Sequence, residues 1–121
     1  MSYEISLYDR GFLDRALREQ LGDWTIADPI LQPSRDVAES FLLDRGYTAF
    51  RYPWQTNGQT YQHPELKQLL EVTIFDGCIS FAIQNSETAL DDIKIAVATA
   101  VQLGRLIDLA VFDPQDGRII E

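Results

Sequence analysis

The stretch LLEVTIFDGCISFAIQ, residues 69–84, decides the fold. Two apolar-rich runs flank Asp76-Gly77, a dipeptide typical of a two-residue type I′ hairpin turn. Because such a turn fixes the register of the strands, Val72 is expected to lie opposite Phe81. In this register one face of the hairpin is entirely apolar and carries Leu70, Val72, Ile74, Ile79, Phe81 and Ile83. Turn chemistry and side-chain pattern together predict a hairpin of residues 69–75 and 78–84.

The segments before the hairpin predict a strand and two helices. Residues 3–8 alternate with period two, which indicates a strand. Asp9 is expected to cap a helix with apolar positions at helical spacing, and Gly22 is placed as its C′ glycine. Ser34 is expected to cap a second helix, which ends at Gly46.

Two segments connect the second helix to the hairpin. The β-branched and aromatic residues of segment 47–52 predict a strand. Residues 53–66 contain two Pro, a Gly, an Asn and several Gln. No periodic apolar pattern runs through them, so they predict a long exposed loop.

The C-terminal third predicts a long helix and a short strand. Thr88 is expected to cap the helix, with Asp91 at its third position. A narrow stripe of small and β-branched residues lets this helix lie close on a sheet; it consists of Ile93, Ala96, Val97, Ala100, Val101 and Gly104. Residues 109–112 form a strand, residues 113–117 a turn, and residues 119–120 a final edge strand or tail.

These segments predict an α+β fold in a single domain, residues 1–121. The expected order is strand, two helices, three strands, helix and strand, with the helices packed on one face of a mostly antiparallel or mixed sheet. The composition of the opposite hairpin face supports a sheet that is covered by helices on one side only. That face is mixed, and consists of Glu71, Thr73, Phe75, Cys78, Ser80 and Ala82.

Charge and composition exclude several classes of protein. Nineteen acidic residues against ten basic ones give a net charge of −9. This charge repels nucleic acid and anionic membranes. It either attracts a basic protein partner or only keeps the protein soluble. No signal peptide or transmembrane run is expected, and the lone Cys78 suits a reducing cytoplasm. The oligomeric state stays open, a homo-oligomer included.

The chain lacks the residue sets of several common enzymes. His63 and Cys78 are the only histidine and the only cysteine, and their contexts argue against a catalytic pair. His63-Pro64-Glu65 matches half of the zinc deaminase signature, but the two further cysteines it needs are missing. Because one His and one Cys leave a tetrahedral site short of ligands, no metal and no cofactor are expected.

An acidic pair near the C-terminus is an alternative site. Asp113 and Asp116, with Asp108 nearby, are candidate carboxylates for Mg²⁺ or Ca²⁺ or for a small enzyme that uses carboxylates. The competing interpretation is structural, because Asp and Pro favour turns and Asp116-Gly117 completes one.

Aromatic residues in irregular segments are candidates for partner binding. Trp24 lies in one such segment, and Tyr52, Trp54 and Tyr61 lie in or next to another. Tryptophan and tyrosine are enriched at interface hot spots. The alternative is that these rings fold back and cover the edge of the sheet.

The C-terminal third also carries a resemblance. The long Ala/Val helix followed by Leu109-Ala110-Val111-Phe112-Asp113-Pro114-Gln115 resembles the ending of small bacterial proteins, some of them similar to immunity proteins of polymorphic toxin systems. The resemblance implies a cytoplasmic, non-enzymatic protein that binds and blocks a cognate toxin. It covers roughly the last 35 residues and transfers no site residue.

The sequence therefore favours a non-enzymatic acidic binding protein, of the immunity or antitoxin type. A small-molecule-binding or regulatory domain is the first alternative, and an enzyme that uses Asp113 and Asp116 is the second. A flat acidic surface with aromatic side chains favours the first hypothesis, an apolar pocket the first alternative, and converging carboxylates the second.

Overall fold

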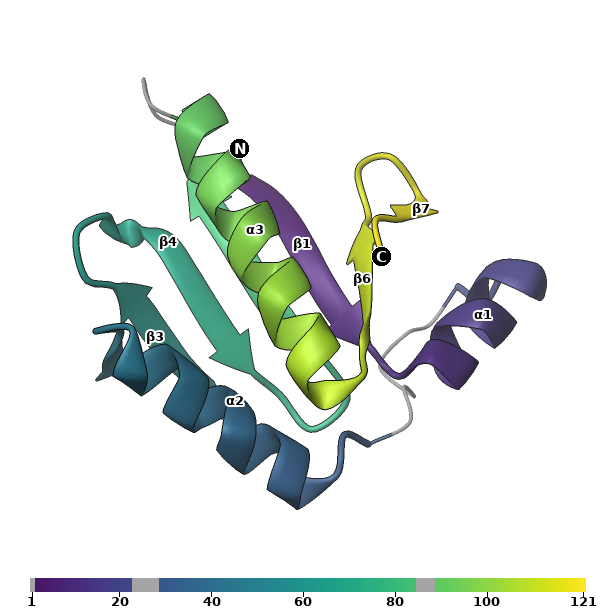
Figure 1. Cartoon of the computed structure of the whole chain (residues 1–121), viewed down its shortest axis with the longest axis horizontal. Coiled ribbons are helices and arrows are strands. Elements are labelled where there is room, and N and C mark those ends of the chain that lie inside the picture. Colours follow the sequence, from purple (N-terminus) through teal and green to yellow (C-terminus); the bar gives the residue numbers. More distant parts are fainter. Residues whose placement is uncertain (1, 23–28, 85–88) are drawn as a thin grey trace.

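The predicted hairpin lies near the middle of a single antiparallel sheet (Figure 1). The computed structural model describes residues 2–22, 29–84 and 89–121. The elements in these ranges are β1 (Ser2–Tyr8), α1 (Arg10–Arg18), α2 (Gln32–Asp44), β2 (Thr48–Phe50), β3 (Gln59–His63), β4 (Lys67–Ile74), β5 (Ile79–Gln84), α3 (Ala89–Ile107), β6 (Ala110–Asp113) and β7 (Arg118–Ile119). The strand order across the sheet is β2-β3-β4-β5-β1-β6-β7. The expected α+β class is confirmed.

The register of the β4–β5 hairpin is the expected one. Val72 lies opposite Phe81, and both side chains are fully buried. The turn itself differs from the prediction, because Asp76 is not among the described non-glycine residues with a positive φ, which type I′ requires. The Asp76 carbonyl accepts the backbone N–H of Ile30 at 2.7 Å, and its carboxylate accepts Arg35 at 2.7 Å. Tertiary contacts therefore hold this turn in another conformation.

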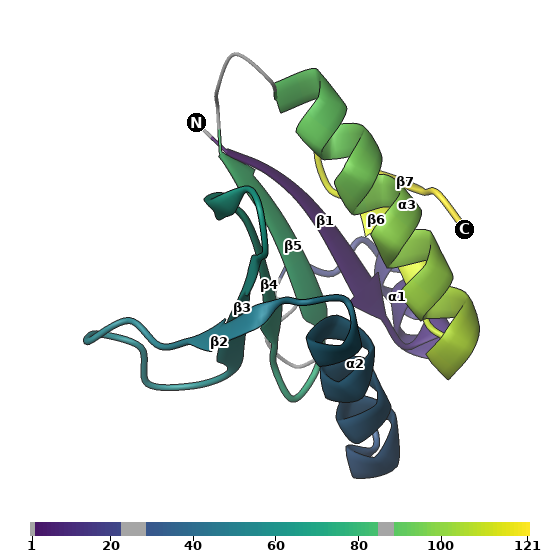
Figure 2. The ribbon, with the colours of Figure 1, turned by 60° about the vertical axis from the view of Figure 1, so that its left-hand side comes forward.

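The main core lies between the sheet and two helices, α2 and α3, which cover one face (Figure 2). Helix α3 approaches the sheet through the small-residue stripe, in which Ala96, Ala100 and Gly104 are buried. A Cβ added at Gly104 would lie 3.0 Å from the Leu109 carbonyl oxygen and 3.0 Å from Val111 Cγ2. The close packing predicted for this helix is confirmed.

The short helix α1 packs against the other face of the sheet. Its Leu13 forms a separate buried cluster with Ala110 and Phe112 of β6, whereas Val111 between them belongs to the main core. Because neighbouring strand residues point to opposite faces, the two clusters lie on opposite sides of β6. The expectation of helices on one face thus holds for α2 and α3 but not for α1.

Segment 53–66 is not one continuous loop, contrary to the prediction. It contains β3, which pairs with both β2 and β4, so the sheet has one strand more between the helices than expected. The strand carries Gln59, Gln62 and His63, and its register with β4 shifts between Gln62 and His63. Polar residues and a bulge conceal the alternation that identifies a strand.

Helix ends match the predictions in part. Asp9 caps α1 by accepting the N–H of Phe12 at 3.0 Å, as expected, but the positive φ falls at Gln20, not at Gly22. Helix α2 begins two residues before Ser34, which therefore lies inside it.

Gly46, which follows α2, has the positive φ of a C′ glycine, as predicted. Thr88 lies outside the described residues. In the described ranges no helix combines the length and apolar character needed to cross a bilayer.

Candidate functional site

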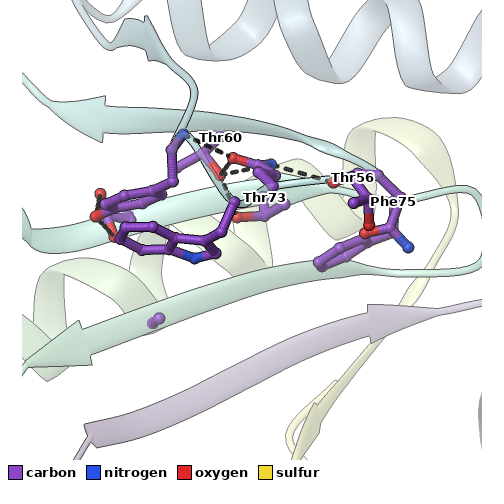
Figure 3. Close-up of a pocket in the computed structure, with 10 residues that line it drawn as sticks. Thr56, Thr60, Thr73 and Phe75 are labelled. Carbon is purple, nitrogen blue, oxygen red and sulfur yellow. Dashed lines mark hydrogen bonds between the residues drawn. The ribbon is translucent and has the colours of Figure 1, made fainter.

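A pocket of about 320 Å³ lies on the sheet face opposite α2 and α3, where the β2–β3 connection meets β3, β4 and β5. Thr60 and Thr73 lie in the middle of this pocket, and Thr56 and Phe75 lie toward one end (Figure 3). Its lining consists of Tyr52, Trp54, Gln55, Thr56, Asn57, Thr60, Glu71, Thr73, Phe75 and Ala82. Aromatic rings, hydroxyls, amides and one carboxylate therefore share one hollow.

A row of hydroxyl groups crosses the sheet at the pocket. Thr60 on β3 pairs with Thr73 on β4, and their hydroxyl oxygens are 2.9 Å apart. Thr73 in turn lies opposite Ser80 on β5, and Ser80 lies opposite Ser6 on β1. The antiparallel register alone brings these four residues into line.

Three aromatic residues alternate along the chain where it leaves β2. The rings of Phe50 and Tyr52 meet edge to face with centroids 4.7 Å apart. The rings of Tyr52 and Trp54 stack, with centroids 4.8 Å apart and 25° between their planes. Trp54 nevertheless remains 74% exposed. We call Phe50, Tyr52 and Trp54 the aromatic platform.

The Glu71 carboxylate anchors the platform to the sheet. The Tyr52 hydroxyl lies 2.6 Å from one carboxylate oxygen and 2.8 Å from the other, and Gln62 Nε2 donates at 2.9 Å. Glu71 is only 9% exposed, so these hydrogen bonds compensate for much of its lost hydration. The bond to the carboxylate, with burial, raises the pKa of Tyr52 to about 12 and keeps the phenol a hydrogen-bond donor.

Gln55 holds the loop between β2 and β3. Its Oε1 accepts the Tyr52 backbone N–H at 3.3 Å, and its Nε2 donates to the Gly58 carbonyl and the Thr60 hydroxyl at 3.2 Å each. Gly58 has a φ of 73°, and a Cβ there would come within 2.9 Å of the Phe75 ring. The loop therefore lies against the sheet, which holds the platform in place.

The structure brings together only two of the four predicted partner-binding residues. Tyr52 and Trp54 form the platform. Tyr61 was predicted to lie in or next to a loop, but it is on β3, 1% exposed, and its hydroxyl donates to Glu39 of α2. Tyr61 is a core residue and is not accessible to a partner. Trp24 lies outside the described residues.

His63 and Cys78 lie at opposite ends of β4. His63 pairs with Lys67, whereas Cys78 lies opposite Phe75, eight residues further along. Because the register shifts after Gln62, the separation is measured along β3, where His63 is four residues from Gln59, the partner of Ile74; at about 3.3 Å per strand residue this is at least roughly 13 Å. The prediction that they form no catalytic pair is therefore confirmed. His63 Nδ1 accepts two backbone N–H groups at 3.1 Å, and burial raises the pKa of the Cys78 thiol to about 11.

The C-terminal carboxylates have structural partners. Asp113 is 4% exposed, accepts the backbone N–H of Gln115 at 2.9 Å, and accepts the Tyr3 hydroxyl. Asp116 pairs with Arg118 at 3.4 Å. The described ranges hold no group of three or more His, Cys, Asp and Glu side chains that could bind a metal ion. The geometry fits the turn interpretation of Asp113.

Sequence reasoning missed most of the pocket lining. The hairpin register had already assigned Glu71, Thr73 and Phe75 to the mixed face, which is the signal that could have found them. Gln55 in the β2–β3 connection and Thr60 on β3 had no such signal, because β3 was not predicted. No known family model matches this chain, and no curated protein is similar enough to serve as a relative.

Proposed function

We propose that this protein is a non-enzymatic acidic binding protein that engages a more basic protein through the aromatic platform. The observation that carries the proposal is Trp54, which is 74% exposed yet stacked on Tyr52. Large aromatic side chains that are held in place before binding contribute much of the affinity at protein interfaces. The Tyr52–Glu71 hydrogen bond supports the proposal, since it removes much of the entropy cost of ordering the platform.

The charge of the chain supports a basic partner. The net charge of −9 attracts positively charged proteins over distances set by the Debye length, about 8 Å at physiological salt. The pocket beside the platform adds a carboxylate, and its lining contains no Lys or Arg. Electrostatic attraction would mainly accelerate association, while Trp54 would slow dissociation.

The resemblance of the C-terminal third to immunity proteins suggests the kind of partner. We propose a cognate bacterial toxin in the cytoplasm, which the acidic protein binds and blocks. A toxin that degrades nucleic acid needs a positively charged surface to bind phosphate, and an acidic inhibitor complements that surface.

The test is stopped-flow binding to the product of the adjacent gene. Trp54→Ala should accelerate dissociation and cost at least about 2 kcal/mol of binding free energy. Leu31→Ala is the matched control, because Leu31 is 73% exposed on another part of the surface. Raising salt from about 0.05 to 0.5 M should slow association of the unmodified protein.

Two results would contradict the proposal. Equal dissociation rates for Trp54→Ala and Leu31→Ala would remove the platform from the interface. An association rate independent of salt would reduce the acidity to a role in solubility.

A small-molecule-binding domain is the second candidate, and the pocket itself favours it. A volume of about 320 Å³ lies at the lower end of the range for ligand sites, and hydroxyl, amide and carboxylate groups converge in it. Native mass spectrometry of the purified protein tests this candidate. A bound small molecule, lost in the Trp54→Ala variant, would support it over the protein partner.

A further inference from the structure

We infer that the pocket beside the aromatic platform receives an arginine side chain of the basic partner. The guanidinium would lie against Trp54 and direct its N–H groups at Glu71. This inference deepens the proposed function, on which it rests for the class of partner, and its test uses isolated peptides.

The aromatic half of the site is open to a cation. Trp54 stacks on Tyr52 with centroids 4.8 Å apart and remains 74% exposed, so much of the indole is left for a ligand. Tryptophan is the best of the aromatic side chains at attracting a cation placed over its ring. The site therefore offers a fixed negative π face at its entrance.

The carboxylate half retains capacity to accept hydrogen bonds. Glu71 accepts one hydrogen bond from the Tyr52 hydroxyl, which lies within reach of both carboxylate oxygens, and one from Gln62 Nε2. An ionised carboxylate accepts about four hydrogen bonds, which leaves room for a guanidinium N–H. Tyr52 contacts both Trp54 and Glu71, and all three line the same pocket, so the π face and the carboxylate belong to one site.

No basic side chain in the pocket lining neutralises the Glu71 carboxylate. None of the ten lining residues is Lys or Arg. Arg51, at the start of the loop, directs Nη1 to the Gly58 carbonyl at 3.5 Å. Glu71 therefore stands among neutral hydrogen-bond donors in the described part of the chain, and an anionic ligand would meet its charge with no compensating base.

The geometry fits arginine better than lysine. A guanidinium is planar, stacks on aromatic rings and presents five donors, whereas an ammonium is compact and strongly hydrated. Residues with acceptor groups for those donors line the pocket: Thr60, Thr73, Asn57 and Glu71. A volume of about 320 Å³ accommodates such a side chain with part of its hydration.

The experiment is an NMR titration of the whole ¹⁵N-labelled chain with three blocked tripeptides, Gly-Arg-Gly, Gly-Lys-Gly and Gly-citrulline-Gly. Citrulline has the shape of arginine without its charge. The Trp54 indole N–H signal, assigned with Trp54→Phe, and the Glu71 and Thr73 amides report on the pocket. We expect arginine to bind best, and citrulline roughly fivefold more weakly or worse, as for a partly exposed ion pair with cation–π contact.

The matched variants are Glu71→Gln and Glu65→Gln. Both remove one negative charge, but Glu65 is exposed and lies outside the pocket lining. Glu71→Gln should abolish the preference for arginine over citrulline, and Glu65→Gln should leave it intact. The peptide comparison on the unmodified protein decides the question even if Glu71→Gln does not fold.

Several outcomes would overturn the inference. Equal binding of arginine and citrulline peptides, an arginine preference that survives Glu71→Gln, or no shift with any peptide up to its solubility limit would each do so. Because no toxin is present, these results are independent of the stopped-flow test. Partner binding through Trp54 without arginine preference would contradict this inference alone.

Discussion

Tyr52 joins the two halves of the candidate site at the scale of a single residue. Its ring supports Trp54, and its hydroxyl donates to Glu71 at 2.6 Å. The same pattern, a phenol that donates to a carboxylate, recurs at Tyr3 with Asp113 and at Tyr61 with Glu39. Each phenol is stabilised in its neutral form, because a tyrosinate next to a carboxylate is repelled.

The tyrosines should therefore ionise late. The pKa is raised to about 12 for Tyr3 and Tyr52, mainly by their carboxylate hydrogen bonds, and for Tyr8, mainly by burial. Burial also raises the pKa of Tyr47 and Tyr61. A titration of tyrosinate absorbance should give a native midpoint clearly above the ordinary value of about 10, and the ordinary value in denaturant.

The sign of the stability change follows from the raised pKa values. In the folded state the phenols hold their protons more tightly than in the unfolded chain, so their contribution is complete below pH 10. It is lost as the pH rises toward 12. Urea unfolding across this window should show the decline. Tyr52→Phe should remove one late-ionising group, and a native midpoint at pH 10 would contradict the assignment.

The β4–β5 hairpin carries the central packing of the sheet at the scale of elements. Phe81 is fully buried opposite Val72. Phe81→Ala should lower the free energy of unfolding by about 3–5 kcal/mol, because it leaves a cavity in a close-packed core. Thr48→Ala, on the exposed edge strand β2, is the control and should change it by no more than about 0.5 kcal/mol. Denaturant unfolding monitored by circular dichroism measures both.

Helix α3 provides a second test of packing, at Gly104. Inside a helix, alanine is more favourable than glycine by about 1 kcal/mol, so helix propensity alone predicts that Gly104→Ala stabilises the protein. The added Cβ would instead lie 3.0 Å from the Leu109 carbonyl, which Arg10 also binds at 3.3 Å. We expect a net loss of about 1–3 kcal/mol. Gly22→Ala, where an added Cβ meets nothing within 4 Å, is the control; a more stable Gly104→Ala would refute the close approach.

Net charge acts at the scale of the whole molecule. With a net charge of −9 on 121 residues, the excess negative side chains repel one another, and this repulsion destabilises the folded state. Raising NaCl from about 0.05 to 0.5 M should therefore increase the melting temperature, since the Debye length falls to a few ångströms. Differential scanning calorimetry measures the change. A melting temperature that falls with salt would mean that attractive ion pairs, such as Arg105–Glu121, outweigh the repulsion.

Only some residues of the candidate site could be predicted from the sequence. Tyr52 and Trp54 of the platform were already candidates from the sequence, because aromatic side chains in an irregular segment stand out in it; their role in binding stays a prediction. Glu71 and Tyr52 are 19 residues apart, and no local pattern predicts that a carboxylate on β4 accepts the hydroxyl of a loop residue. Tyr61 shows the converse error: it was grouped with the loop aromatics, but strand pairing places it in the core.

The sequence by itself determined the β4–β5 register, the α+β class and the close packing of α3. Each follows from short-range patterns, namely a two-residue turn, alternation, and small residues at helical spacing. Only the tertiary structure decided the strand β3, the conformation at Asp76 and the pocket. The strand is polar and bulged, so its neighbours and not its own side chains select it. The Asp76 turn is set by Ile30 and Arg35. The pocket exists because the pairing of β2, β3 and β4 brings the β2–β3 connection, with Tyr52 and Trp54, next to Glu71 of β4.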